Sequence, residues 1–151
     1  MSKSVIDLRS IIFIRLLVGV VFFEEGVQKF LFPTLMGAGR FARIGIPWPT
    51  VMGPFVGTVE IVCGALIVLG VYTRIAAIPL LVDIIVAILS TKVPILLGNG
   101  YGPFHLASLN RYGFWSMASE ARTDFSMLMG LFFLLAAGPG SLSFQRRQSR
   151  D

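Results

Sequence analysis

The chain has 151 residues, of which 55% are hydrophobic and only 14% are charged, and its mean hydropathy is +0.80. Soluble domains carry about 25% charged residues, so this composition excludes an ordinary soluble protein and predicts one membrane domain over residues 1–151. The formal net charge of +5 does not indicate nucleic-acid binding, because the basic residues lie mainly between and after the apolar runs, as they do beside membrane spans.

The first predicted element is a membrane-spanning helix over residues 11–32, since about 20 apolar residues cross the hydrocarbon core. The start superficially resembles a signal peptide. However, the apolar run holds Arg15 and two glutamates and lacks an A-x-A cleavage site, so we expect an uncleaved helix. Helical spacing places on one face Arg15, Gly19, Phe22, Gly26 and Lys29. Glu25 flanks this face, whereas Glu24 points almost opposite Arg15, so Glu25 is the preferred interior carboxylate.

The second predicted span covers residues 51–71, and in the connector before it we expect a short interfacial helix around residues 39–44. Glu60 lies in the middle of this span, where a carboxylate is costly and rare without a partner or a function. Its helical face otherwise holds small residues, Gly53, Gly57 and Gly64. Because small residues let membrane helices approach closely, we expect Glu60 to face another helix rather than lipid.

The third predicted span covers residues 75–97 and follows the second after only three residues, so the two must form a tight antiparallel pair. Lys92 and Pro94 interrupt the apolar run near its end. The face that we expect to turn inward carries small and polar residues, namely Ala76, Asp83, Ala87 and Ser90. Asp83 is therefore a second interior carboxylate.

The fourth predicted span covers residues 122–138 and is short, with a long connection before it that is rich in glycine and aromatic residues. Such aromatic rings suit the membrane–water interface. Together these elements predict an all-α membrane protein. Its fold class is a four-transmembrane-helix antiparallel bundle, with a tight turn between helices 2 and 3 and longer connections 1–2 and 3–4.

The number of positive charges on the two faces favours one membrane orientation by a small margin. The face that carries both termini and the tight turn holds Lys3, Arg9, Arg15, Arg74, Arg146, Arg147 and Arg150. The opposite face holds Lys29, Arg40, Arg43, Lys92, Arg111 and Arg122. The compact basic tail after the last span favours cytoplasmic termini in a bacterial inner membrane.

Phase and depth gather a polar core within the spans. A rise of about 1.5 Å per residue places Glu25, Glu60 and Asp83 at comparable depths, with Arg15 able to reach them by extending its long stem. The candidates for a ligand site or polar core are Arg15, Phe22, Glu25, Lys29, Glu60 and Asp83. Weaker candidates are Glu24, His105, Arg122 and Asp124. Three interpretations remain open: structural ion pairing, a proton or substrate path, and a site for a quinone-like head group.

Cys63 and His105 are the chain's one cysteine and one histidine. A disulfide-exchange motif, a bis-histidine haem site and a structural zinc site all need more ligands than these. Cys63 is expected to be an apolar packing residue, and His105 a residue of a wet loop. We therefore expect no intrinsic cofactor and no metal site.

Several motifs in order resemble the DoxX family: RLLVGVVFFEEGVQKF, GRFARIGIPWP, GPFVGTVEIVCGALIVLGVYTRIAAIPLL and GPGSLS. The resemblance runs from residue 15 to residue 143. It implies a bacterial inner-membrane four-helix bundle, in a family that is named after a thiosulfate:quinone oxidoreductase and includes relatives linked to oxidoreductase or thiol-stress complexes. The positions that match the family pattern are Arg15, Gly26, Lys29, Glu60 and Arg74. The Glu24–Glu25 pair, Phe144 and the long third connection depart from it.

The working hypothesis is a subunit of a quinone-linked oxidoreductase, in which Phe22, Glu25, Glu60 and Asp83 line a head-group pocket and Arg15 balances the acids. A partner protein or a bound cofactor would have to supply the redox centre. The first alternative is a non-enzymatic membrane anchor or assembly partner of a redox protein, using the glycine faces for association. The second is a small transporter or permease, which would need a homo-oligomer.

Overall fold

The computed structural model describes residues 5–140, with side chains from residue 10 onward, and this part of the chain is helical and free of β-strands. An isolated bridge joins Tyr101 to Phe104 in the long loop. In chain order the elements are α1 (Val5–Leu31), α2 (Ala38–Ile44), α3 (Pro49–Leu69), α4 (Thr73–Ala87), the π-helical turn η1 (Ile88–Lys92), α5 (Val93–Leu97), α6 (Phe114–Glu120) and α7 (Arg122–Ala137).

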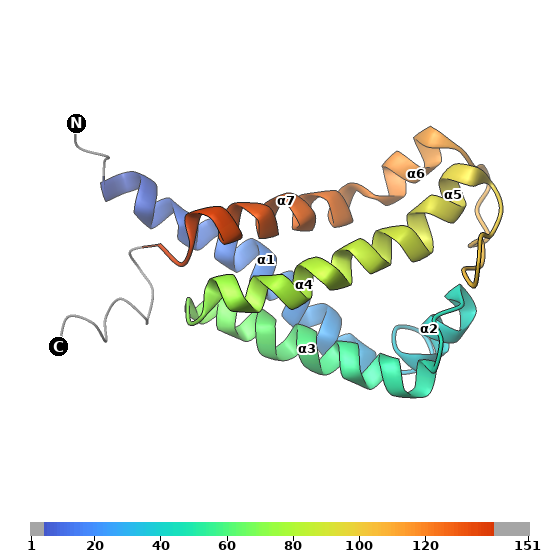
Figure 1. Ribbon diagram of the computed structural model, residues 1–151, viewed down its shortest axis with the longest axis horizontal. Helices are drawn as coiled ribbons and strands as arrows, with labels where there is room; N and C mark the ends of the chain where they lie inside the picture. Colours follow the sequence, from blue (N-terminus) through green and yellow to red (C-terminus); the bar gives the residue numbers. More distant parts are fainter. Residues whose placement is uncertain (1–4, 141–151) are drawn as a thin grey trace.

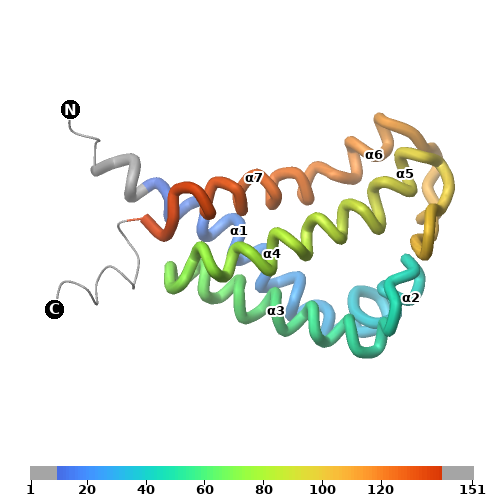
Figure 2. Tube along the Cα trace, in the orientation of Figure 1, coloured from blue at the N-terminus to red at the C-terminus, as the bar shows by residue number. Residues whose placement is uncertain are grey.

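The long helices α1, α3, α4 and α7 lie along the long axis of the molecule, and consecutive ones run in opposite directions (Figure 1). Helix α1 packs mainly on α3, and α4 packs mainly on α7. Both ends of the described chain lie beside the α3–α4 turn, whereas α2, α5 and α6 lie at the other end (Figure 2). Lys3, the basic tail of residues 146–150 and Phe144 lie outside the described residues, so the orientation stays a prediction.

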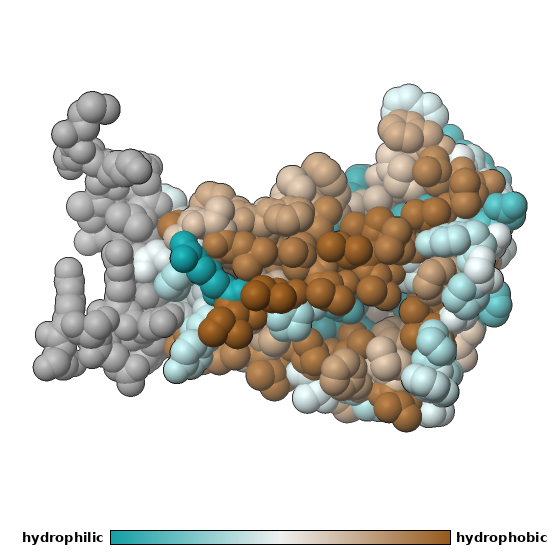
Figure 3. Space-filling model, in the orientation of Figure 1, coloured by the Kyte–Doolittle hydropathy of each residue, from teal (hydrophilic) through white to brown (hydrophobic). Residues whose placement is uncertain are grey.

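Two helical stretches among the described residues are long and apolar enough to cross a membrane, Pro49–Leu69 and Thr73–Leu97. The outer surfaces of the long helices carry large exposed apolar side chains, such as Phe13, Val62, Ile78 and Phe132. Figure 3 shows this apolar surface along the helices and polar residues gathered at the end with α2 and the long loop. An apolar exterior of this extent suits contact with lipid rather than water.

Glycine pairs bring α1 and α3 into near-backbone contact. A Cβ atom on Gly26 would lie 2.6 Å from the Gly57 carbonyl oxygen, and one on Gly64 would lie 2.8 Å from the Gly19 carbonyl oxygen. The α1 residues predicted to share one face are all buried, and so are those predicted for α3. The glycine face of α3 is thus covered by α1 and, at Gly53, by the start of α2, so it is unavailable for association with another protein.

The third long helix does not break where Lys92 and Pro94 interrupt its apolar pattern. It widens into the π-turn η1 and resumes as α5, where Pro94 lies in the first turn. The Thr91 hydroxyl donates to the Ala87 carbonyl oxygen at 2.6 Å. The extra residue of the turn changes which side chains of this helix face inward, and π-turns are frequent at functional sites.

An arginine clamp, formed by Arg15 and Arg74, closes the end of the molecule with the α3–α4 turn. Arg15 donates to the carbonyl oxygens of Ile67 (2.9 Å), Val68 (2.6 Å) and Pro139 (3.1 Å). Arg74 donates to the Ala136 carbonyl oxygen at 3.0 Å.

The prediction that Arg15 balances the membrane acids is therefore wrong. The last carbonyl groups of a helix lack intrahelical donors and carry the negative end of its dipole, so the end of α3 is a strong acceptor for a guanidinium. Gly70 has φ +72°, and a Cβ atom there would lie 2.5 Å from the Arg15 guanidinium. Glycine at this turn therefore makes room for the buried cation.

Candidate functional site

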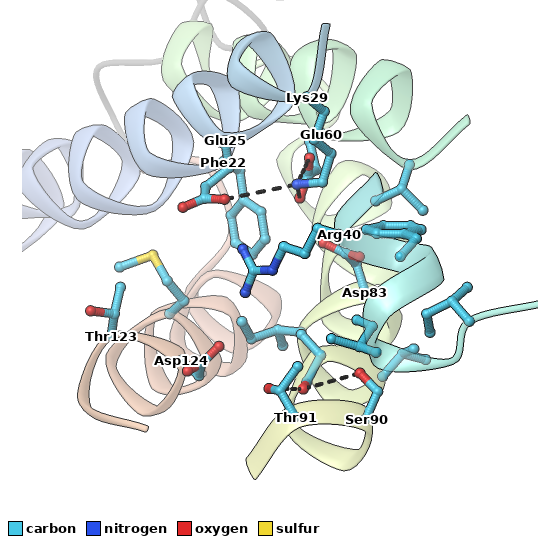
Figure 4. Close-up of a pocket in the computed structure, with 18 of the residues that line it drawn as sticks. Phe22, Glu25, Lys29, Arg40, Glu60, Asp83, Ser90, Thr91, Thr123 and Asp124 are labelled. Carbon is cyan, nitrogen blue, oxygen red and sulfur yellow. Dashed lines mark hydrogen bonds and ion pairs between the residues drawn. The ribbon is translucent and has the colours of Figure 1, made fainter. Parts of the chain in front are cut away.

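A cavity of about 320 Å³ lies at the opposite end, between the α1–α3 pair and the α4–α7 pair. Every helix except α5 contributes to its wall, and Figure 4 shows side chains from these elements converging on one space. Its charged lining residues are Glu25, Lys29, Arg40, Glu60, Asp83, Lys92, Glu120 and Asp124. Five of these are acidic and three are basic, so the pocket holds five of the chain's eight acidic residues.

A buried ion pair joins α1 to α3 inside the pocket. The Lys29 ammonium lies 2.6 Å from Glu60 Oε2 and donates to Oε1 at 2.8 Å, and both side chains are less than a tenth exposed. Glu25 Oε2 lies farther from the same ammonium, at 3.8 Å, and its side chain is 41% exposed. Lys29 is therefore the cation that binds Glu60, and Glu25 stands at the wetter edge.

A second ion pair joins η1 to the start of α7. Lys92 Nζ lies 3.2 Å from Asp124 Oδ2, with both side chains mostly buried. Asp124 was predicted only as a weaker candidate, whereas Lys92 was not predicted as a site residue at all. The sequence signal for this pair is a lysine in the last turns of one span and an aspartate in the first turn of the next. The two residues can meet because the connection between these spans reverses the direction of the chain.

Asp83 and Phe22 complete the inner wall. Asp83 projects from α4 and lines the same cavity as Glu60 (Figure 4). The Phe22 ring is 3% exposed and presents an apolar surface beside the acids (Figure 4). The pocket therefore combines an aromatic and aliphatic wall with ion-paired and hydrogen-bonding groups.

Arg40 enters the pocket from the short helix α2, and Figure 4 shows its side chain reaching into the central space. Among the described residues it makes no hydrogen bond and no ion pair within 4 Å. Sequence reasoning placed Arg40 among the flanking charges and missed it as a site residue. The available signal was its position in the short helix that was predicted to be interfacial.

Four of the predicted residues lie outside this pocket. Arg15 belongs to the clamp. Glu24 is exposed and accepts a hydrogen bond from Gln28 Nε2 at 2.8 Å, and Arg122 is exposed and donates to the Ser119 carbonyl oxygen at 2.8 Å. His105 is exposed in the long loop, with Nδ1 3.1 Å from the Arg43 carbonyl oxygen. The predicted residues that the structure brings together are Phe22, Glu25, Lys29, Glu60, Asp83 and Asp124.

Hydroxyl groups that were not predicted as site residues also line the pocket, from Ser90, Thr91 and Thr123. Those of Ser90 and Thr91 donate to the Ala87 carbonyl oxygen at 3.3 Å and 2.6 Å, so toward a ligand they can act as acceptors. Ser90 is almost fully buried, and the π-turn directs it and Thr91 toward the cavity (Figure 4). Among the side chains that the structure describes, those of residues 10–140, no group of three or more His, Cys, Asp or Glu is arranged to hold a metal ion.

Comparison with known proteins adds the following findings. The DoxX family matches residues 10–93 of this chain. The chain is 53% identical over 141 residues to the "Uncharacterized membrane protein Rv3486" of Mycobacterium tuberculosis, covering 93% of this chain and 82% of that protein. No solved structure matches the chain.

Proposed function

This chain belongs to the DoxX family of membrane proteins, and we propose that it is the quinone-binding subunit of a membrane oxidoreductase complex. In this proposal the protein spans a bacterial inner membrane as an antiparallel four-helix bundle. Helix α3 and the continuous α4–α5 stretch support two of the spans by length and composition. Helices α1 and α7 pack lengthwise on these two and would be the other spans.

With both termini in the cytoplasm, the arginine clamp lies near the cytoplasmic face and the pocket lies in the opposite half of the membrane. The pocket is then close enough to lipid for a hydrophobic molecule to reach it and close enough to the surface to exchange protons with water. This position suits a lipid-soluble molecule that carries a polar head group at one end.

One observation supports the quinone proposal most strongly: a single cavity joins an aromatic wall to fixed hydrogen-bond donors and acceptors. A quinone head group is a flat ring with two oxygen atoms, so it needs an apolar surface for the ring and donors for the oxygens. Phe22 offers the first, and Arg40 and Lys29 offer the second. Glu60 and Asp83 could accept protons from the reduced form.

The redox centre would belong to a partner protein or to a bound cofactor, because one cysteine and one histidine give this chain little means to carry electrons. The pocket would then hold the quinone while the partner exchanges electrons with it. In this arrangement the chain's own residues bind and orient the ring and manage protons at its oxygen atoms.

The direct test is equilibrium dialysis of 2-methyl-1,4-naphthoquinone against the purified full-length protein in lipid nanodiscs, with empty nanodiscs as the background. We expect saturable binding above that background, and weaker binding in Asp83→Asn, which keeps the size of the side chain but not its charge. The control variant is Glu24→Gln, outside the pocket. If the quinone partitions to the same extent into nanodiscs with and without the protein, the quinone-binding proposal is rejected.

The excess of five acidic over three basic pocket residues favours a second candidate, a path for protons or small cations. Such a path would need a homo-oligomer, because a single chain of four helices offers little room for a gated passage. Proteoliposome flux that disappears in Asp83→Asn, without quinone binding, would favour this candidate over the first.

A further inference from the structure

Arg40 differs from the other cations of the pocket. Lys29 binds Glu60 and Lys92 binds Asp124, whereas the Arg40 guanidinium has no hydrogen-bond or ion-pair partner among the described side chains and backbone groups. A guanidinium carries five N–H donors, and in a partly buried position these donors require acceptors. The cavity beside it can therefore supply acceptors for these donors, from water or from a bound molecule.

Helix α2 is held in place without help from the Arg40 side chain. A Cβ atom on Gly53 of α3 would lie 2.7 Å from the Ala38 amide nitrogen, which shows how closely α2 approaches α3. On the same helix, Arg43 donates to the carbonyl oxygens of Thr34 (2.8 Å) and Leu35 (3.0 Å). Arg43 thus anchors the helix while Arg40 remains free to bind.

The long loop also fastens this helix from the other side. The His105 amide donates to the Ile44 carbonyl oxygen at 3.1 Å, and a Cβ atom on Gly45 would overlap the Pro103 carbonyl oxygen. Both ends of α2 are therefore fixed by contacts with backbone atoms. The guanidinium is presented to the cavity from a rigid support, as a preorganised binding group requires.

The charge of the pocket restricts what Arg40 can bind. Five carboxyl groups against three cations make the cavity unfavourable for an anion, so the acceptor that fits best is a neutral oxygen. We propose that Arg40 is the ligand-recognition residue of this site and donates hydrogen bonds to a carbonyl oxygen of the quinone head group. This inference rests on the proposed quinone-binding function and names the residue that makes the site selective for oxygen-bearing rings.

The test compares two probes of the same ring size, 2-methyl-1,4-naphthoquinone and 2-methylnaphthalene, by equilibrium dialysis with the full-length protein in nanodiscs. Arg40→Gln should raise the Kd for the quinone about tenfold or more, because a hydrogen bond from a charged donor contributes about 1.5–3 kcal/mol. Arg40→Lys, which keeps one charged donor, should give an intermediate Kd. Binding of the hydrocarbon should be the same in all these proteins.

The matched control is Arg111→Gln, which removes an exposed arginine that does not line the cavity and should leave the Kd unchanged. Wild-type affinity for the quinone in both Arg40 variants would overturn the role of Arg40 while leaving a quinone pocket intact. Absence of quinone binding by the wild type would instead overturn the proposed function together with this inference. Competition by inorganic sulfate that depends on Arg40 would assign the residue to an anion and overturn the carbonyl contact.

Discussion

The two ends of the molecule use cations in opposite ways. At the closed end, Arg15 and Arg74 donate to backbone carbonyl oxygens where α3 and α7 finish. At the open end, Lys29 and Lys92 bind carboxylates on other helices, and Arg40 faces a cavity. At the closed end positive charge stabilises helix ends, whereas at the open end charged side chains line a cavity.

The difference follows from what receives each cation. A helix that ends inside a membrane protein leaves carbonyl groups that need donors, and a nearby guanidinium satisfies several of them at once. Its hydrogen-bond donors then bind the backbone and are not available to a ligand. A cation that faces a cavity can still bind a ligand. A charged residue in an apolar span therefore does not by itself mark a functional site.

The largest effect should come from breaking the closed end. Replacing Arg15 by methionine removes a buried cation and leaves the carbonyl groups of Ile67 and Val68 without their donor. We expect this change to lower the free energy of unfolding by about 4 kcal/mol. The measurement is unfolding by added sodium dodecyl sulfate in mixed micelles, followed by circular dichroism.

Arg74→Met is the matched control for that experiment. Arg74 is exposed and makes one hydrogen bond to the described chain, so its loss should cost less than about 1.5 kcal/mol. Equal losses for the two variants would contradict the view that burial and multiple carbonyl contacts make Arg15 the main stabilising residue of the clamp.

A smaller effect is expected at the open end, where water in the cavity can partly solvate a charge that loses its partner. Lys29→Met leaves Glu60 buried without its cation, and we expect a loss of about 3 kcal/mol in unfolding free energy. Adding Glu60→Gln to this variant should restore about half of the loss, because a neutral amide needs no countercharge. No recovery in the double variant would show that Lys29 stabilises the fold by packing rather than by its charge.

Much of this arrangement could be predicted from spacing alone. The buried faces of α1 and α3 follow from glycine and charged residues three, four and seven positions apart, and Glu60 is buried where that pattern places it. Asp83 and Glu25 line the pocket for the same reason. Periodicity reports which way a side chain points because the geometry of a helix is regular.

Other features depend on contacts that periodicity does not describe. Arg15 has the phase of the polar core, but its long side chain extends toward the end of α3 rather than toward the acids, and phase cannot tell these directions apart. Lys92 enters the site through a π-turn, which changes the register of the helix. Arg40 reaches the pocket from a helix in a connector, where position depends on the fold of the whole chain.

The smallest expected effect separates the two adjacent glutamates of α1, which are matched in chemistry and differ in position. Glu25 lies 3.8 Å from Lys29 at the edge of the pocket, whereas Glu24 faces outward and binds Gln28. A partly exposed ion pair contributes less than about 1 kcal/mol, so Glu25→Gln should change the Kd for 2-methyl-1,4-naphthoquinone by no more than about fivefold. Glu24→Gln should leave it unchanged. A larger effect at Glu24 than at Glu25 would mean that the ligand meets the outer face of α1, and the distinction between a binding end and a structural end would then fail. A larger effect on the Kd at Glu25 than at Glu24 would instead place the edge of the binding site between these two neighbouring residues.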